Sequence, residues 1–152
     1  MITHIKLRVA VPLVLIGAIF SSVAGAAERL EGPIPAQVVR VVDGDTLMVR
    51  AHIWLGQEVE TLVRLEGTDT PELKARCEQE REKALAARDF LVARVDGKLV
   101  QLHDILTDKY GGRVRAQVLD ASGADLSVEL IKQGLARRYD GGQRQSWCTG
   151  AE

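Results

Sequence analysis

The sequence predicts an α+β, mainly β fold: a five-stranded barrel of the OB kind, with a long helix between strands 3 and 4 and a short C-terminal helix. Five segments are rich in β-branched residues or alternate between apolar and polar residues, and short polar turns join most of them. One long segment between the third and fourth of these has helical periodicity instead. A small barrel suits this order because it needs no exposed sheet face.

The chain of 152 residues divides into three parts. Residues 1–26 are predicted to be a secretory signal peptide, and residues 27–36, which contain two prolines, a short leader. Residues 37–152 are predicted to form one domain with a short carboxy-terminal tail, because the remaining length suits a single core and is too short for two ordinary domains.

The first part shows the three regions of a signal peptide. Lys6 and Arg8 precede an apolar run over 9–20, and the small residues 24–26 form a cleavage site of the A-x-A kind. The alternative is a membrane-anchoring helix, which is disfavoured because the run is short and contains a proline and a glycine. We therefore expect a cleaved protein that is secreted or periplasmic, with no stable membrane association.

The charge balance excludes a protein that holds duplex DNA by bulk electrostatics. Loss of Lys6 and Arg8 from the 20 basic residues leaves 18 against 21 acidic ones, a net charge of −3. A nucleic-acid enzyme of this charge needs a local basic patch, and metal ions that offset its own carboxylates.

Three strands joined by short turns make up the first half of the predicted barrel. The segment 37–42 is apolar and β-branched and ends at an Asp-Gly turn, after which 46–53 continues as a strand. A reversal over 55–57 leads to 58–66, which alternates between its two faces. In such a meander the polar turns carry the residues of functional interest.

A long helix and two further strands follow. Residues 78–95 have apolar residues at helical spacing, acidic residues in the first turn and an Asp-Gly stop. Segments 98–106 and 113–118 regain strand character, and Asp125 is a plausible N-cap for a short helix over 126–133. The tail beyond this helix is glycine-rich and is predicted to be irregular.

Two cysteines, Cys77 and Cys148, remain after signal removal. Paired cysteines in an exported chain usually form a disulfide. Because the loop between these two cysteines is long, the loop-entropy model gives a stabilisation of the folded state of about 4 kcal/mol. Two free thiols are the alternative, whereas a metal site is disfavoured because no C-x-x-C motif or nearby histidine supplies further ligands. A bridge would pin the tail to the start of the long helix.

Two acidic turns with an arginine between them carry the strongest functional signal. The first contains Asp45, and the second follows Arg64 and contains Asp69 and Glu72. Folding back of the intervening hairpin would bring these four side chains into one pocket. Carboxylates are ligands that Ca²⁺ prefers, and metal-assisted phosphodiester hydrolysis needs a further carboxylate and an arginine beside them. An Asp-Gly pair alone indicates only a tight turn.

Four segments, covering nearly all of the mature chain, carry a specific resemblance. They read Val-Val-Asp-Gly-Asp-Thr at 41–46, Arg-Leu-Glu-Gly-Thr-Asp-Thr-Pro-Glu at 64–72, Asp-Lys-Tyr-Gly-Gly-Arg at 108–113 and Leu-Ile-Lys-Gln-Gly-Leu-Ala at 130–136. Together they resemble the staphylococcal-nuclease-like (thermonuclease) family. This resemblance implies an OB barrel that cleaves DNA and RNA in a Ca²⁺-dependent reaction and leaves 3′-phosphate ends. We expect little sequence specificity and a monomer.

The resemblance also implies a metal site and a general base. It makes Asp45 and Asp69 carboxylate ligands of Ca²⁺, with the backbone carbonyl of Thr70 as a further ligand. A cation held there can polarise a phosphoryl oxygen and lower the pKa of a water molecule. Glu72 matches the general-base candidate, which would accept a proton from that water.

Further residues are matched to substrate contacts. Arg64 and Arg113 correspond to two phosphate-binding arginines, whose planar forks can each bind two phosphate oxygens. Lys109 and Tyr110 correspond to contacts with a terminal phosphate of the bound strand. Tyr139 lies near the position of a base-stacking tyrosine, and a packed tail residue is the alternative.

Other features are less specific. A locally basic carboxy-terminal region is either an ordinary solvated face or a patch that guides the phosphate backbone. His52 and His103 are expected at the surface or barrel edge. Trp54 and Trp147 are expected to be packing aromatics, with base stacking as the alternative. The residues of the basic region are Lys132, Arg137, Arg138 and Arg144.

An inactive OB module that binds nucleic acid or a protein is the alternative function. Loss of the acids or arginines would indicate that alternative, and all are present.

Overall fold

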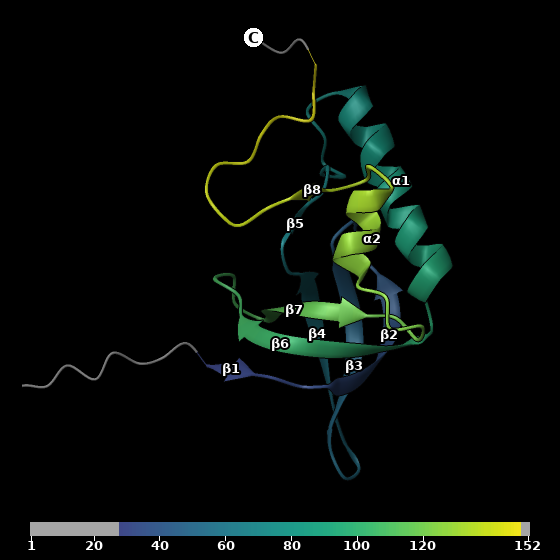
Figure 1. Cartoon of the computed structure of the whole chain (residues 1–152), viewed down its shortest axis with the longest axis vertical. Coiled ribbons are helices and arrows are strands. Elements are labelled where there is room, and N and C mark those ends of the chain that lie inside the picture. Colours follow the sequence, from purple (N-terminus) through teal and green to yellow (C-terminus); the bar gives the residue numbers. More distant parts are fainter. Residues whose placement is uncertain (1–27, 150–152) are drawn as a thin grey trace, which may run out of the picture.

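A computed structural model describes residues 28–149 (Figure 1). The predicted signal peptide lies outside the described residues. Among the helices of residues 28–149, none has the length and apolar character needed to cross a membrane.

Five long strands close into a barrel. They follow the order β6–β2–β3–β4–β7, and β6 pairs again with β7 to complete the ring. Every pairing around the ring is antiparallel except that of β4 with β7, which is parallel. This mainly β barrel with two helices confirms the predicted OB-like fold class. The strands are β2 (Ile34–Val41), β3 (Thr46–Trp54), β4 (Gln57–Leu65), β6 (Leu99–Thr107) and β7 (Arg113–Leu119).

Three two-residue strands extend this frame. β1 (Arg29–Leu30) pairs with β6, and the start of β2 also pairs with β6 from Ile34 onward. The barrel therefore begins inside the segment predicted to be a leader, because backbone pairing does not require the apolar pattern that is missing there. β5 (Thr68–Asp69) and β8 (Arg137–Arg138) form a separate antiparallel pair, which the sequence pattern did not reveal.

Two helices cover the end of the barrel that carries the acidic turns (Figure 1). α1 spans Glu78–Val95, the predicted range, and its first turn is capped by the Cys77 sulfur, which accepts from the Glu80 amide. α2 spans Leu126–Lys132, and the predicted cap Asp125 accepts from the amides of Ser127 and Val128.

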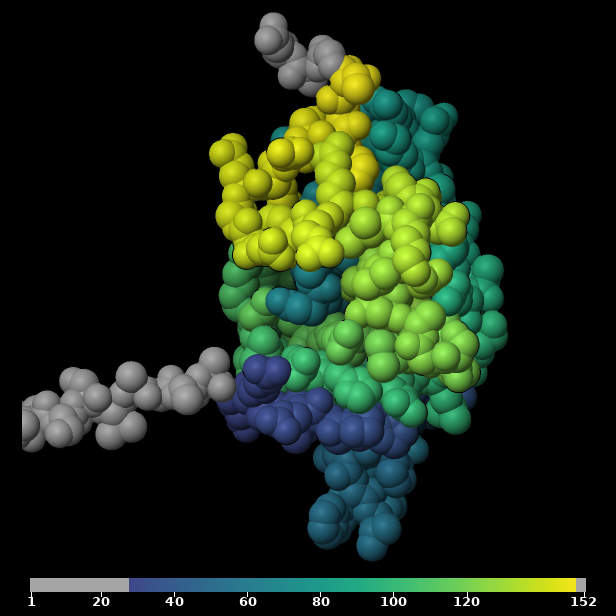
Figure 2. Space-filling view, viewed as in Figure 1, coloured from purple at the N-terminus to yellow at the C-terminus, as the bar shows by residue number. Residues whose placement is uncertain are grey.

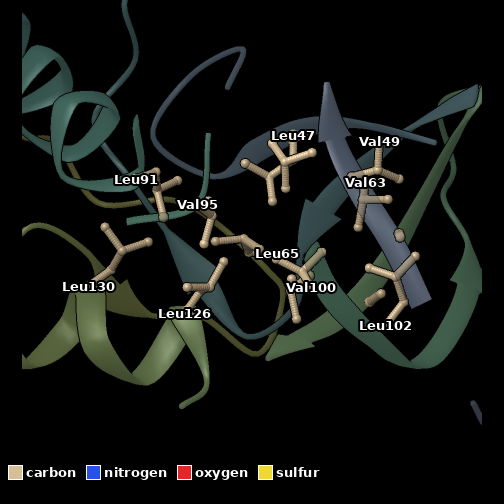
Figure 3. Packing of buried hydrophobic residues seen from close by; sticks show 14 of the residues in the cluster. Leu47, Val49, Val63, Leu65, Leu91, Val95, Val100, Leu102, Leu126 and Leu130 are labelled. Carbon is tan, nitrogen blue, oxygen red and sulfur yellow. The ribbon is translucent and has the colours of Figure 1, made fainter. Parts of the chain in front are cut away.

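A single apolar core joins the barrel to both helices (Figure 3). Strand residues such as Leu47 and Val63 are fully buried, and Leu91 of α1 and Leu130 of α2 close the core from the helical side. Burial of this kind is the main favourable term in folding. The core therefore fixes the strand ends that carry the two acidic turns.

The β3–β4 hairpin projects beyond the barrel (Figure 1). Trp54, at its tip, is 72% exposed, so the prediction that it is a packing residue is wrong. The physical reason is that β2 pairs with β3 only as far as Ala51, so no strand or helix within residues 28–149 covers the tip. Trp147 is only 8% exposed and packs as predicted.

A disulfide joins Cys77 to Cys148 across 71 residues of sequence, which agrees with the first of the two alternatives for these cysteines. It ties the tail to the start of α1. Reduction is expected to lower Tm by roughly 10 °C or more, because the loop is long enough for a stabilisation of about 4 kcal/mol. Calorimetry with and without reductant measures this.

The control for this prediction is a Cys77→Ser/Cys148→Ser protein, in which serine can still cap α1. Its Tm should match that of the reduced protein and should not respond to reductant. An unchanged Tm of the parent protein on reduction would show that the bridge adds no stability.

Candidate active site

The two acidic turns pack directly against each other and against α1. Gly44 makes this possible, since a Cβ at this position would lie 2.9 Å from the Ala87 Cβ and 3.2 Å from the Thr70 Cβ. The turn is closed by the Val42 amide, which donates to the Thr46 carbonyl. A glycine here therefore permits close packing, beyond the turn chemistry seen in the sequence.

Asp45 and Arg64 form a buried ion pair beside these turns. Thr46 and Arg64 are cross-strand partners on β3 and β4, and the Arg64 Nη2 lies 3.1 Å from the Asp45 Oδ2. Arg64 also donates to the Thr68 carbonyl at 2.9 Å, and the Thr46 hydroxyl donates to Asp45 at 2.9 Å. Both charged groups are thus held in one geometry at the end of the barrel.

Asp69 lies on β5 and is only 3% exposed. Its Oδ2 accepts from the indole N–H of Trp147 at 3.1 Å, while its Oδ1 is buried and accepts no hydrogen bond from the described residues. Burial raises the pKa of Asp69, and the charge of Arg144 opposes this. A buried carboxylate oxygen without a hydrogen bond is a candidate ligand for a cation.

Glu72 stands at the solvent side of the same cluster, with a side chain that is 56% exposed. Its loop is held by Glu80 of α1, whose carboxylate accepts from the backbone amides of Glu72 and Arg76. Glu72 is therefore accessible to water while its backbone is anchored to the long helix.

The Arg144 guanidinium lies among these carboxylates and pairs with three of them. Its Nε lies 2.9 Å from the Asp69 Oδ1, its Nη2 lies 4.0 Å from the Asp45 Oδ2, and its Nη1 contacts the Glu72 carboxylate. Burial lowers the pKa of Arg144, but the three carboxylates outweigh this and raise it overall. The sequence pattern places Arg144 only in a basic run and does not indicate its contacts with the acidic turns. The available signal was Cys148, four residues later, whose bridge returns this segment to α1.

Asp43 adds a fourth carboxylate to the cluster. Burial and the neighbouring Asp45 charge raise its pKa to about 6. Its Oδ1 accepts from the Asp45 backbone amide at 3.1 Å, so it shapes the turn that presents Asp45. The cluster thus holds more acidic groups than basic ones, which is the charge pattern of a cation site.

An open groove of about 1090 Å³ runs from this cluster across the barrel. Lys109, Tyr110, Arg113 and Tyr139 line it together with Arg64, so the predicted substrate-contacting residues share one surface. In Figure 2 the yellow tail stands above the green end of β6 and β7, with a hollow between them. The Tyr139 hydroxyl donates to the Gly142 carbonyl at 2.7 Å, which keeps this residue in the tail wall of the groove.

Arg113 and Arg64 lie on adjacent parallel strands. Arg113 is paired in register with Leu62, two residues from Arg64, so both arginines are on the same face. The Arg113 Nε donates to the Asp108 carboxylate at 2.6 Å; burial opposes ionisation of Asp108, but this bond and charge lower its pKa. Asp108 therefore orients the guanidinium at the groove wall.

The four basic residues of the carboxy-terminal run do not form one patch. Lys132 pairs with Glu129 on α2, as expected of a solvated face. Arg137 lies over the Trp147 ring at 3.7 Å and has a structural role. Only Arg144 enters the acidic cluster, so neither alternative for the run holds for all its members.

Within residues 28–149, one group of three acidic or sulfur-containing side chains has its potential ligand atoms close enough together to hold a metal ion, and it lies outside the acidic cluster. Cys77, Glu80 and Cys148 have potential ligand atoms within 4.8 Å of one another. The two sulfurs are bonded to each other, so they offer no thiolate. These three residues therefore have a structural role, in which the disulfide ties the tail to the start of α1.

Comparison with known proteins finds relatives that are named as endonucleases. The chain is 31% identical over 122 residues to "Endonuclease YhcR" of Bacillus subtilis (strain 168), over 75% of this chain and 10% of that protein. It is 30% identical over 107 residues to an "Uncharacterized endonuclease" of Escherichia coli, over 70% of this chain and 62% of the relative. The chain thus spans less than two thirds of either relative. Residues 62–148 match the staphylococcal nuclease homologue family, to which this chain belongs.

Proposed function

We propose that this protein is an exported, Ca²⁺-dependent endonuclease that hydrolyses the phosphodiester bonds of DNA and RNA with little sequence specificity. The observation that carries the proposal is the gathering of Asp45, Arg64 and Glu72 in the lining of one open groove, with Asp69 beside them and linked to them through Arg144. Membership of the family and the endonuclease names of two relatives support it.

The residues present fit a hard divalent cation. Asp45 and Asp69 would hold it through carboxylate oxygens and Thr70 through its backbone carbonyl, and the buried Asp69 Oδ1 accepts no hydrogen bond from the described residues. A bound Ca²⁺ would supply Lewis acidity, which polarises a phosphoryl oxygen and acidifies water.

The protein's own groups supply the rest of the chemistry. Arg64 is held by the Asp45 carboxylate and the Thr68 carbonyl, so its guanidinium is already positioned at the groove wall, where its remaining N–H groups would bind a phosphate oxygen. Arg113, held by Asp108, offers a second fork from the neighbouring strand. Glu72 lines the same groove, is exposed to solvent and can accept a proton from the attacking water.

The groove explains the expected lack of sequence preference. Its charged lining suits phosphates, and contacts to the backbone position a strand without specifying its bases. Lys109 and Tyr110 would contact a terminal phosphate, and Tyr139 would stack on a base. The resemblance to the staphylococcal-nuclease-like family implies cleavage on the 5′-oxygen side, which leaves 3′-phosphate ends.

The test is cleavage of plasmid DNA, single-stranded DNA and RNA in Ca²⁺ or in chelator. We expect cleavage of all three in Ca²⁺, none in chelator, and products whose 3′ ends accept extension only after phosphatase treatment. Glu72→Gln should lower the rate by about 10²- to 10⁴-fold. Lys132→Gln, on α2, is the control and should retain activity. Undiminished cleavage in chelator would contradict the metal requirement, and binding without cleavage under any cation would favour an inactive module.

A further inference from the structure

The Arg144 guanidinium occupies the centre of the acidic cluster. It lies 2.9 Å from the Asp69 Oδ1 and 4.0 Å from the Asp45 Oδ2, and it contacts Glu72. The contact with Asp69 is one of charge, since the N–H does not point at the Oδ1 atom closely enough for a hydrogen bond. Arg144 therefore touches the carboxylates proposed to hold the cation and to act as the base.

The segment that carries Arg144 is anchored close to it on the carboxy-terminal side. Trp147 is buried, and its indole N–H donates to Asp69 at 3.1 Å. Cys148 is bonded to Cys77 at the start of α1. These two anchors lie three and four residues from Arg144, so the guanidinium is directed into the cluster by the fold and its placement is not that of a free surface side chain.

We propose that Arg144 is a resident counter-cation of this site, which competes with the divalent cation for Asp45 and Asp69. This inference rests on the proposed function. The Asp69 Oδ1 cannot lie 2.9 Å from the guanidinium and also hold a cation at about 2.3–2.6 Å without placing two positive groups side by side. Binding of the cation must therefore displace Arg144, and the segment 139–148 sets the Ca²⁺ concentration at which the site fills.

The experiment is a calorimetric titration of the intact, disulfide-bonded protein with CaCl₂ at fixed ionic strength. Arg144→Gln is expected to bind Ca²⁺ about 5- to 150-fold more tightly than the parent protein, the usual range for coupled binding equilibria. Arg81→Gln removes the same charge from an exposed position on α1 and should leave the affinity unchanged within about twofold.

A second variant distinguishes the loss of the Arg144 contacts from misfolding of the protein. Arg144→Lys keeps the charge but loses the planar fork that spans several carboxylates, so its Ca²⁺ affinity should lie between those of the parent and of Arg144→Gln. Far-ultraviolet circular dichroism and Tm without Ca²⁺ verify that each variant is folded.

The outcomes separate this inference from the proposed function. Equal or weaker Ca²⁺ binding by Arg144→Gln, with Ca²⁺-dependent cleavage intact in the parent protein, overturns the role of Arg144 alone. Absence of both Ca²⁺ binding and cleavage in the parent protein overturns both. Tighter binding by Arg144→Gln, with no change in Arg81→Gln, supports the inference.

Discussion

Arg64→Lys is expected to lower kcat/KM for DNA cleavage by about 10²- to 10³-fold while the protein remains folded. Lysine keeps the positive charge beside the buried Asp45, so no carboxylate is left without a counter-charge. It loses the planar fork, which in the present structure contacts both Asp45 and the Thr68 carbonyl. Steady-state kinetics on a single-stranded oligonucleotide, with Tm measured in parallel, separates the two effects.

Arg50→Lys is the matched control for this prediction. Arg50 also pairs with a carboxylate, Glu60, at 2.6 Å, but it lies on the exposed part of β3 and does not line the groove. Its kcat/KM should stay within about threefold of the parent value, because exposed ion pairs contribute little. If Arg64→Lys cleaved as fast as Arg50→Lys, Arg64 would have no role in stabilising the transition state.

Asp69→Asn is expected to abolish measurable Ca²⁺ binding and to lower cleavage at least roughly 100-fold, because a bound metal contributes several kcal/mol to such reactions. Asparagine has the same shape, and its amide oxygen can still accept the Trp147 indole N–H. It also removes a buried negative charge close to Asp45, so we expect Tm to change by only a few degrees. Calorimetric titration and oligonucleotide cleavage measure the two losses.

Asp89→Asn makes the same chemical change on the exposed side of α1, where Asp89 pairs with Arg88. This variant should bind Ca²⁺ and cleave as the parent does. Retention of full Ca²⁺ affinity by Asp69→Asn would remove Asp69 from the ligand set and would leave Arg144 as the only positive group that its buried Oδ1 contacts among the described residues.

The fold could be predicted from local pattern. α1 has the predicted range because its apolar spacing, its acidic first turn and the Asp-Gly stop all act over short distances. The long strands could be predicted for the same reason, and their ends differ from the predicted ones by at most three residues. The exposed Trp54 was misplaced, since hydrophobicity predicts burial only where another element is available to cover the side chain.

The sequence by itself determined the family, the barrel and the identity of the residues proposed for the site, because these are encoded in short runs such as 64–72. Tertiary structure decided which side chains share the site. Arg144 and Trp147 reach Asp69 only because β8 pairs with β5 and a disulfide closes a loop of 71 residues. Such contacts depend on the path of the whole chain, and neither periodicity nor motif spacing carries that information.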